Sequence, residues 1–298
     1  MSQRREIVGE LVEGGISERL ACRAVGVNRS SYQYKPNNST RQQDDLRIRA
    51  AVVKLAHKHR RYGYRRVTAL LRRNGESERV NHKRVWSIWC SEGLSLPRRR
   101  PRKRRANTIV QLPTKAEYRG HVWTYDFVFD RSERGELLKM LTVLDEHTRE
   151  CHRIRVGLQL DSEAVIETLS ELFESHGAPA YLRSDNGGEF IAHKLAQWLA
   201  EHGTETIHIE PGHPWENGYA ESFIGKFRDE CLNEETFWNE RHAQVVVERW
   251  RTHYNEERPH SSLGYRTPSE VAAAWGHACP QAGVEQYSAQ AEAERLTF

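Results

Sequence analysis

The chain has 298 residues, a length that accommodates one catalytic domain with smaller attachments. It contains no run of about 18 to 20 apolar residues and begins without the apolar region of a secretory signal, so we expect a cytoplasmic protein that is neither membrane-spanning nor exported. Its five cysteines form no C-x-x-C pair and no Cys/His cluster, which indicates neither a disulfide framework nor a structural zinc, and its net charge of +4 conceals a strong asymmetry.

Positive charge is concentrated in one segment of the chain. Residues 41–106 contain 21 Lys and Arg against 5 Asp and Glu, whereas residues 107–298 contain 18 against 32. A charge run is often a solvated helix face, but an excess of this size repels itself and indicates either a polyanionic partner or a disordered tail. We favour nucleic acid as the partner of this segment.

Residues 1–40 are predicted to form a helix-turn-helix domain of three short helices. Gly14 and Gly15 end the first helix, and Ser17 can cap the second. The predicted apolar face of the second helix carries Leu20, Ala21, Ala24 and Val25. Such an outline is typical of DNA-binding domains.

A second helical DNA-binding region is predicted over residues 41–97. Its helix YRRVTALLRR carries Val67, Leu70 and Leu71 on a core stripe and places Arg65, Arg66, Arg72 and Arg73 outside that stripe. Trp86 and Trp89 could stack on bases, but on an amphipathic helix beside Val85 and Ile88 they are expected to be core residues. Residues 98–115 begin with RRRPRKRR, which has no apolar face and is predicted to be an extended basic linker along a phosphate backbone.

Residues 116–232 have the periodicity of an α/β domain. Three strands are predicted in HVWTYDFVFD, ELLKMLTVLD and CHRIRVGLQL, followed by helix, strand, helix, strand and helix. Three sequential antiparallel strands and a fourth reached by a crossover helix give an RNase H-like mixed five-stranded sheet with flanking helices. A helical extension and tail are expected over residues 233–298.

Three acidic residues are expected to meet in this fold. Asp126 lies mid-way along the first strand, Asp185 follows the fourth, and Glu221 lies on the next helix. Asp185 precedes Asn-Gly, which often marks a hairpin, but the sequence after it is helical, so it is placed in a strand-to-helix turn. Carboxylates with open water positions suit Mg²⁺ or Mn²⁺, and two such ions can activate the attacking oxygen and stabilise the leaving oxygen of a phosphodiester.

The sequence resembles the OrfB-type DDE transposases of the insertion-sequence-three family, which are similar to retroviral integrases. The resemblance rests on WTYDFV, RSDNGGEF, HPWENGYAESFIGKFRDECLN and YNEERPHSSLGYRTP, within roughly residues 120–270. It implies that Asp126, Asp185 and Glu221 are catalytic metal ligands. It also implies cleavage by water at the element's ends, followed by attack of the freed 3′-hydroxyl on another phosphodiester.

Further residues are predicted to contact DNA. Asn217 and Arg228 share the helix face of Glu221, although Arg228 could equally be a solvated arginine. Arg258 is a candidate for phosphate contact within a motif that is otherwise structural, since Thr267–Glu270 reads as a capping box with proline at the first helical position. The remaining candidates are Arg65, Arg66, Asn81, His82, Lys83, Arg84, Arg98, Arg99, Arg100, Arg102, Lys103, Arg104 and Arg105.

The function predicted from the sequence is that of a DNA transposase acting on double-stranded DNA, as a homo-oligomer, in the bacterial cytoplasm at the nucleoid. A metal-dependent nuclease of the same fold and a non-catalytic DNA-binding regulator are the alternatives. The three acids argue against the regulator, and two DNA-binding regions argue against a simple nuclease. The family also implies an upstream OrfA product or frameshift fusion as a partner, because this sequence has no heptad run of its own.

Overall fold

The computed structural model describes residues 2–34, 38–73, 75, 80–95, 115–184, 193–209 and 217–275. The chain forms two compact units, residues 1–55 and 56–298. In the first unit, α1 (Ser2–Glu13), α2 (Glu18–Val25) and α3 (Arg29–Gln33) enclose a small core of Val8, Ala21, Cys22 and Val27. The predicted three-helix order is present, but Leu20 is exposed because the buried face of α2 runs through Ala21 and Cys22.

Three helices follow before the sheet. They are α4 (Asn38–Lys58), α5 (Tyr64–Arg73) and α6 (His82–Ser91). The predicted core stripe of α5 is confirmed, since Val67, Leu70 and Leu71 are buried. On α6, Trp89 is buried as predicted, whereas the prediction that Trp86 is a core residue is wrong. Trp86 is exposed and its ring lies against Tyr64, with centroids 4.8 Å apart.

The sheet of the second unit has the predicted five strands. They are β1 (Val122–Arg131), β2 (Leu137–Asp145), β3 (Cys151–Gly157), β4 (Tyr181–Ser184) and β5 (Glu205–His208), in the order β3-β2-β1-β4-β5. The first three strands pair antiparallel, and β4 pairs parallel with both β1 and β5. The crossover that this parallel pairing requires is α7 (Ser162–His176), which Asp161 caps and Gly177 ends.

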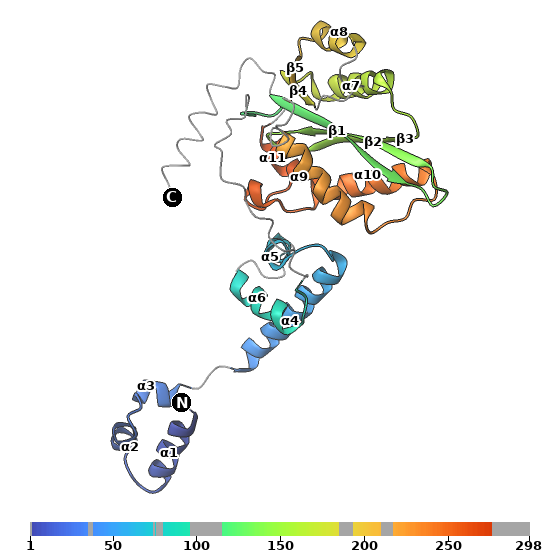
Figure 1. Cartoon of the computed structure of the whole chain (residues 1–298). Coiled ribbons are helices and arrows are strands. Elements are labelled where there is room, and N and C mark those ends of the chain that lie inside the picture. Colours follow the sequence, from blue (N-terminus) through green and yellow to red (C-terminus); the bar gives the residue numbers. More distant parts are fainter. Residues whose placement is uncertain are drawn as a thin grey trace. The chain divides into compact units, whose positions relative to one another are not determined.

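Helices cover both faces of the sheet (Figure 1): α7 and α8 (His193–Glu201) lie on one face, and α9 (Gly218–Phe227), α10 (Glu240–Glu256) and α11 (Pro268–Trp275) on the other. Because successive strand residues point to opposite faces, Trp123 and Tyr125 of β1 join the core with α7 and α8. Val128 joins the other core, with Phe223 of α9. Asp126 lies two residues before Val128 on β1, so its side chain points toward the same face of the sheet, which α9 covers.

Asn217 is the N-cap residue of α9, but its side chain makes no capping hydrogen bond. The predicted capping box at α11 is confirmed. Its Thr267 N–H donates to Glu270 Oε2 at 2.8 Å, while Glu270 N–H donates to Thr267 Oγ1 at 3.3 Å. A π-helical turn, Arg228–Leu232, extends α9. None of the helices in the described ranges is long and apolar enough to cross a membrane.

Candidate active site

Asp126 is held at the middle of β1 by the residue that begins α9. The side-chain amide of Asn217 donates from Nδ2 to Asp126 Oδ2 at 3.2 Å, and the Thr124 hydroxyl donates to Asn217 Oδ1 at 3.1 Å. The other carboxylate oxygen, Oδ1, accepts the backbone N–H of Phe127 at 2.8 Å. Asn217 is buried, so its amide makes a fixed connection between α9 and the strand.

Glu221 lies one helical turn after Asn217, on the same face of α9. Phe223 and Phe227 anchor the helix in the core beneath β1 and β2, which leaves the Glu221 side chain exposed at the surface. Within the described residues, Glu221 makes no ion pair and no side-chain hydrogen bond. The structure therefore brings two of the three predicted acids, Asp126 and Glu221, to one region, where α9 crosses β1.

Asp185 lies outside the described residues, so its role stays a prediction. The strand before it is described: β4 ends at Ser184 and runs parallel to β1, with Arg183 opposite Thr124. The last described residues of β4 therefore lie beside the part of β1 that immediately precedes Asp126. Among the described residues, no group of three or more His, Cys, Asp or Glu side chains could hold a metal ion, and Asp185 of the predicted triad is not among those residues.

Two predicted DNA-binding residues, Arg66 and Arg258, are engaged inside the protein. Arg258 is fully buried and binds the Glu230 carboxylate through Nε at 2.6 Å and Nη2 at 2.5 Å. Arg66 Nη1 lies 3.4 Å from the same carboxylate, and burial lowers the pKa of Arg66. The prediction that Arg258 contacts phosphate is therefore corrected, because a buried arginine in a bidentate ion pair is closed to a DNA backbone.

The contact around Glu230 joins α5 and the turn before it to the catalytic domain. Tyr62 is buried beside this ion pair, and its hydroxyl lies 2.9 Å from His253 Nε2. His59 stacks on Tyr62 with ring centroids 4.6 Å apart. Tyr62 and Arg66 therefore pack against the catalytic domain. The Asn217 side chain binds Asp126, and its predicted contact with the DNA strand stays a prediction.

The remaining predicted DNA contacts are placed as follows. Arg228 is exposed at the end of α9, and Arg65 is exposed on α5, where its Nε donates to Tyr64 Oη at 3.1 Å. Asn81 caps α6 by accepting the Lys83 N–H, and His82 and Lys83 are exposed while Arg84 is half-buried. The basic residues of 98–105 lie outside the described residues, so the predictions for them stay open.

Known proteins match nearly the whole chain. Two family models of the integrase core domain match residues 116–214 and 202–268. A family model of an HTH-like domain matches residues 42–102. A 31.7 kDa protein of insertion element IS407 from Burkholderia multivorans is 42% identical over 87% of this chain and 91% of its own length. The transposase InsD of insertion element IS2 from Escherichia coli is 28% identical over 87% of this chain and 92% of its own.

A solved structure of the catalytic core of BIV integrase is 18% identical, with a TM-score of 0.42 over 53% of this chain and 97% of that one. The sequence relationship to the insertion-element proteins is much stronger than this likeness and extends over both the helical region and the sheet domain. The chain belongs to the integrase-core transposases of insertion sequences, the OrfB-type DDE transposases of the insertion-sequence-three family.

Proposed function

We propose that this transposase cleaves DNA at the ends of its element and joins the freed 3′-hydroxyl to a second phosphodiester, using Asp126, Asp185 and Glu221. The observation that carries the proposal is the hydrogen bond from Asn217 to Asp126, because it ties the first turn of α9 to the middle of β1. Two acids far apart in the sequence are thereby presented on one region of the surface.

The residues present fit a divalent metal site. Carboxylate oxygens are hard ligands, Asp126 is half-buried and oriented by Asn217, and Glu221 is exposed and makes no ion pair among the described residues. We infer Mg²⁺ or Mn²⁺, as two ions. When bound, the metal lowers the pKa of the attacking hydroxyl or water and neutralises charge on the phosphodiester.

The protein's own part in the reaction is orientation. Asn217 fixes one Asp126 oxygen, and the Phe127 N–H fixes the other, so the carboxylate is held before substrate arrives. Arg228 shares the face of Glu221 and is exposed, which suits contact with a phosphate of the bound strand. A joining reaction involves two element ends, so we infer a homo-oligomer on DNA. Participation of an upstream OrfA product or frameshift fusion stays a prediction.

The test of this proposal is a joining assay with labelled element ends and a target plasmid. We expect cleaved ends and joined products that depend on Mg²⁺ or Mn²⁺ and vanish with EDTA. Cleavage that produces no joined product would favour a metal-dependent nuclease, and specific binding without cleavage would favour a regulator.

Asn217→Ala is expected to reduce joining about 10- to 100-fold, because it removes the donor that orients a proposed metal ligand. Since Asn217 positions Asp126 and does not bind metal itself, the Mn²⁺ concentration for half-maximal activity should rise as well. Joining measured across a Mn²⁺ series checks both effects. Asn233→Ala, at an exposed asparagine just after α9, is the matched control and should leave the series unchanged.

The basic linker and α6 are proposed to bind DNA in different ways. Each phosphate contact contributes about −0.9 to the slope of log affinity against log salt, and phosphate contacts carry no sequence information directly. Replacement of the seven Arg and Lys residues of 98–105 by Gln should therefore flatten the slope and weaken binding to all sequences about equally. Substitutions at Asn81, His82, Lys83 and Arg84 should instead reduce discrimination between element ends and random DNA. An unchanged salt slope in the linker variant would show that the linker is only a tether.

A further inference from the structure

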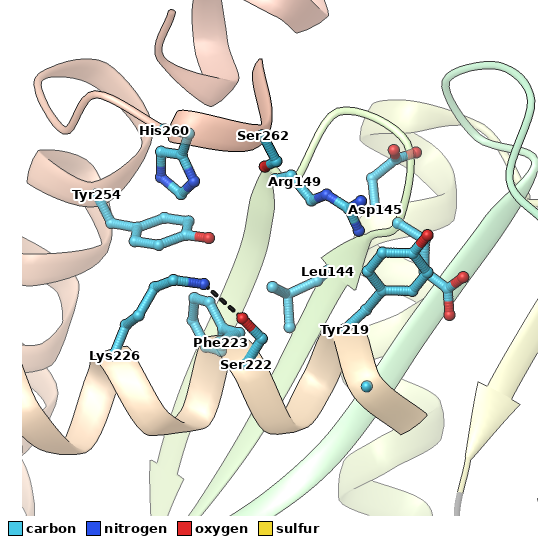
Figure 2. Close-up of a pocket in the computed structure, with 12 residues that line it drawn as sticks. Leu144, Asp145, Arg149, Tyr219, Ser222, Phe223, Lys226, Tyr254, His260 and Ser262 are labelled. Atoms are coloured by element: carbon cyan, nitrogen blue, oxygen red, sulfur yellow. Dashed lines mark hydrogen bonds between the residues drawn. The ribbon is translucent and has the colours of Figure 1, made fainter. Parts of the chain in front are cut away.

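A pocket of about 370 Å³ lies beside the candidate active site, on the flank of α9 adjacent to the Glu221 face. Its walls come from the turn between β2 and β3, from α9, from the end of α10, and from the segment around Ser262. Figure 2 shows the polar ends of Lys226, Ser222 and Tyr254 on one side of the pocket and the Arg149 guanidinium on the other side, next to Tyr219. The proposed mechanism does not use any of these side chains.

Arg149 and Lys226 line this pocket and make no ion pair among the described residues, although Arg149 lies close enough to Glu146 to lower the pKa of that carboxyl. Lys226 Nζ lies 2.7 Å from Ser222 Oγ and makes no ion pair. The Arg149 guanidinium lies over the Tyr219 ring, with Cζ 3.7 Å from the centroid, and its Nη1 is buried without a hydrogen-bond partner. A buried donor that is left unsatisfied costs free energy, and a hydrogen bond to an acceptor would remove that cost.

Two carboxylates, Asp145 and Glu146, line the pocket, and Glu146 Oε2 is buried without a hydrogen-bond partner. Asp145 accepts hydrogen bonds from the backbone N–H groups of Gly120, His147 and Thr148. Glu146 Oε1 pairs with Arg183 Nε at 2.8 Å, and both side chains are fully buried. Glu230, which lies outside the pocket lining, is shared by Arg66 and Arg258. The lining thus holds two basic side chains and two carboxylates, of which Glu146 is paired with Arg183 outside the lining.

The backbone at Arg149 supports a functional placement. Arg149 has a φ of 64°, in the left-handed region that non-glycine residues adopt only at a cost in free energy. Its N–H donates to the Asp145 carbonyl at 2.9 Å, which closes the turn and directs the guanidinium over Tyr219. A strained residue whose side chain is also unsatisfied is a reason to look for a ligand.

We propose that Arg149 and Lys226, with the hydroxyls of Ser222 and Ser262, bind one phosphate group of a DNA strand that passes the active site. The ligand chemistry is a phosphate, for which Arg and Lys side chains and neutral hydroxyl donors are suited. DNA is the inferred source of this phosphate because Ser222 directly follows Glu221 on α9. A phosphate bound by Ser222 is therefore held by the same helix that carries Glu221. This inference rests on the proposed function and adds a positioning site to it.

The charge state of Lys226 is sensitive to an anion. Burial, with Arg258 and Arg66 nearby, lowers the pKa of Lys226 to about 8, while burial lowers the pKa of His260 to about 2 and keeps that imidazole neutral. Glu146, whose pKa burial raises to about 7, opposes anion binding more as pH rises. A bound phosphate stabilises the Lys226 ammonium, so DNA affinity should fall as pH rises from 7 to 9.

The test is DNA binding by the full chain across a salt series. The double variant Arg149→Gln/Lys226→Gln should flatten the slope of log affinity against log salt by about 0.9, the value for one phosphate, and weaken binding about tenfold. The matched control, Arg134→Gln/Arg241→Gln, removes the same charge from two exposed positions and should change the slope less. Wild-type slope in the double variant overturns the proposal.

A second variant keeps the test decisive if the double variant is unstable. Lys226→Arg retains the charge at all pH values up to 9. It should preserve the salt slope and lose the part of the pH dependence that Lys226 causes, whereas an unaltered pH profile contradicts the proposal. The phosphate could come from DNA or from free inorganic phosphate. Exchanging chloride for inorganic phosphate at constant ionic strength distinguishes these two sources. If inorganic phosphate alone stabilises the wild-type protein and the double variant binds DNA as the wild type does, the pocket is a site for free phosphate.

An error in the assignment of this pocket and an error in the proposed function give different results in the binding and joining assays. If the wild-type protein binds and joins element ends but the double variant behaves like wild type, only the pocket assignment is wrong. If the wild-type protein shows no joining under any condition, the proposed function itself is wrong.

Discussion

The variants Asp126→Asn and Glu221→Gln are expected to lose cleavage and joining by roughly a thousandfold or more, because removal of one ligand from a two-metal site removes several kcal/mol of transition-state stabilisation. Asp126 is fixed by Asn217, and Glu221 is exposed, so neither change should disturb the fold. Joined product formed from labelled ends in Mg²⁺ is the measurement.

A charge-matched control is available at Glu256, an exposed residue of α10, where Glu256→Gln should keep full activity. DNA binding in the absence of metal should be unaffected in all three variants, since the acids bind metal and not phosphate directly. Joining near the wild-type rate by Glu221→Gln would mean that this glutamate has been misassigned.

Glu230→Gln is expected to destabilise the second unit by about 3–5 kcal/mol, the range measured when one partner of a buried ion pair is removed. The side chains of Glu230 and Arg258 are 9% and 1% exposed, and Arg66 shares the same carboxylate. Removal of the negative charge would leave the Arg258 guanidinium buried without a counter-ion. Thermal unfolding should show a midpoint lowered on the order of 10 °C. Denaturant unfolding should show a lower midpoint concentration.

The double variant Glu230→Gln/Arg258→Met separates the ion pair from simple loss of packing. Removal of both charges should cost less than Glu230→Gln alone, because no charge is left uncompensated, and the resulting coupling energy measures the pair. Glu235→Gln, at an exposed acid a few residues on, is the control. A single variant as stable as wild type would contradict the view that this ion pair holds the α5 region and the catalytic domain together.

Much of the fold was predictable because its signals are local. Alternation in the three sequential strands, the Asp161 cap and Gly177 stop of α7, and the capping box at Thr267 each depend on residues close in sequence. The parallel placement of β4 beside β1 follows from its crossover helix, and that placement is observed. The hydrogen bond from Asn217 to Asp126 connects the strand of one proposed acid with the helix of another, and the meeting of all three acids stays a prediction.

What could not be predicted depends on contacts between distant residues. An arginine in a sequence looks the same whether it faces DNA or a buried acid, and only the fold places Arg258 against Glu230, 28 residues away. Asn217 reaches Asp126 across 91 residues. Amphipathic periodicity likewise placed Trp86 in the core, yet the helix turns this ring outward because Val85, Ile88 and Trp89 already fill the buried face.

The most direct test of the central claim compares two pre-cleaved element ends that differ by one atom at the 3′ terminus. In the proposed reaction the 3′-hydroxyl is the nucleophile, and Asp126, Asp185 and Glu221 serve its attack on target DNA. With Mg²⁺ and target plasmid, we predict joining of the 3′-hydroxyl end and none of the 3′-deoxy end. Joining of the 3′-deoxy end, or target cleavage without joining from the 3′-hydroxyl end, would contradict the account.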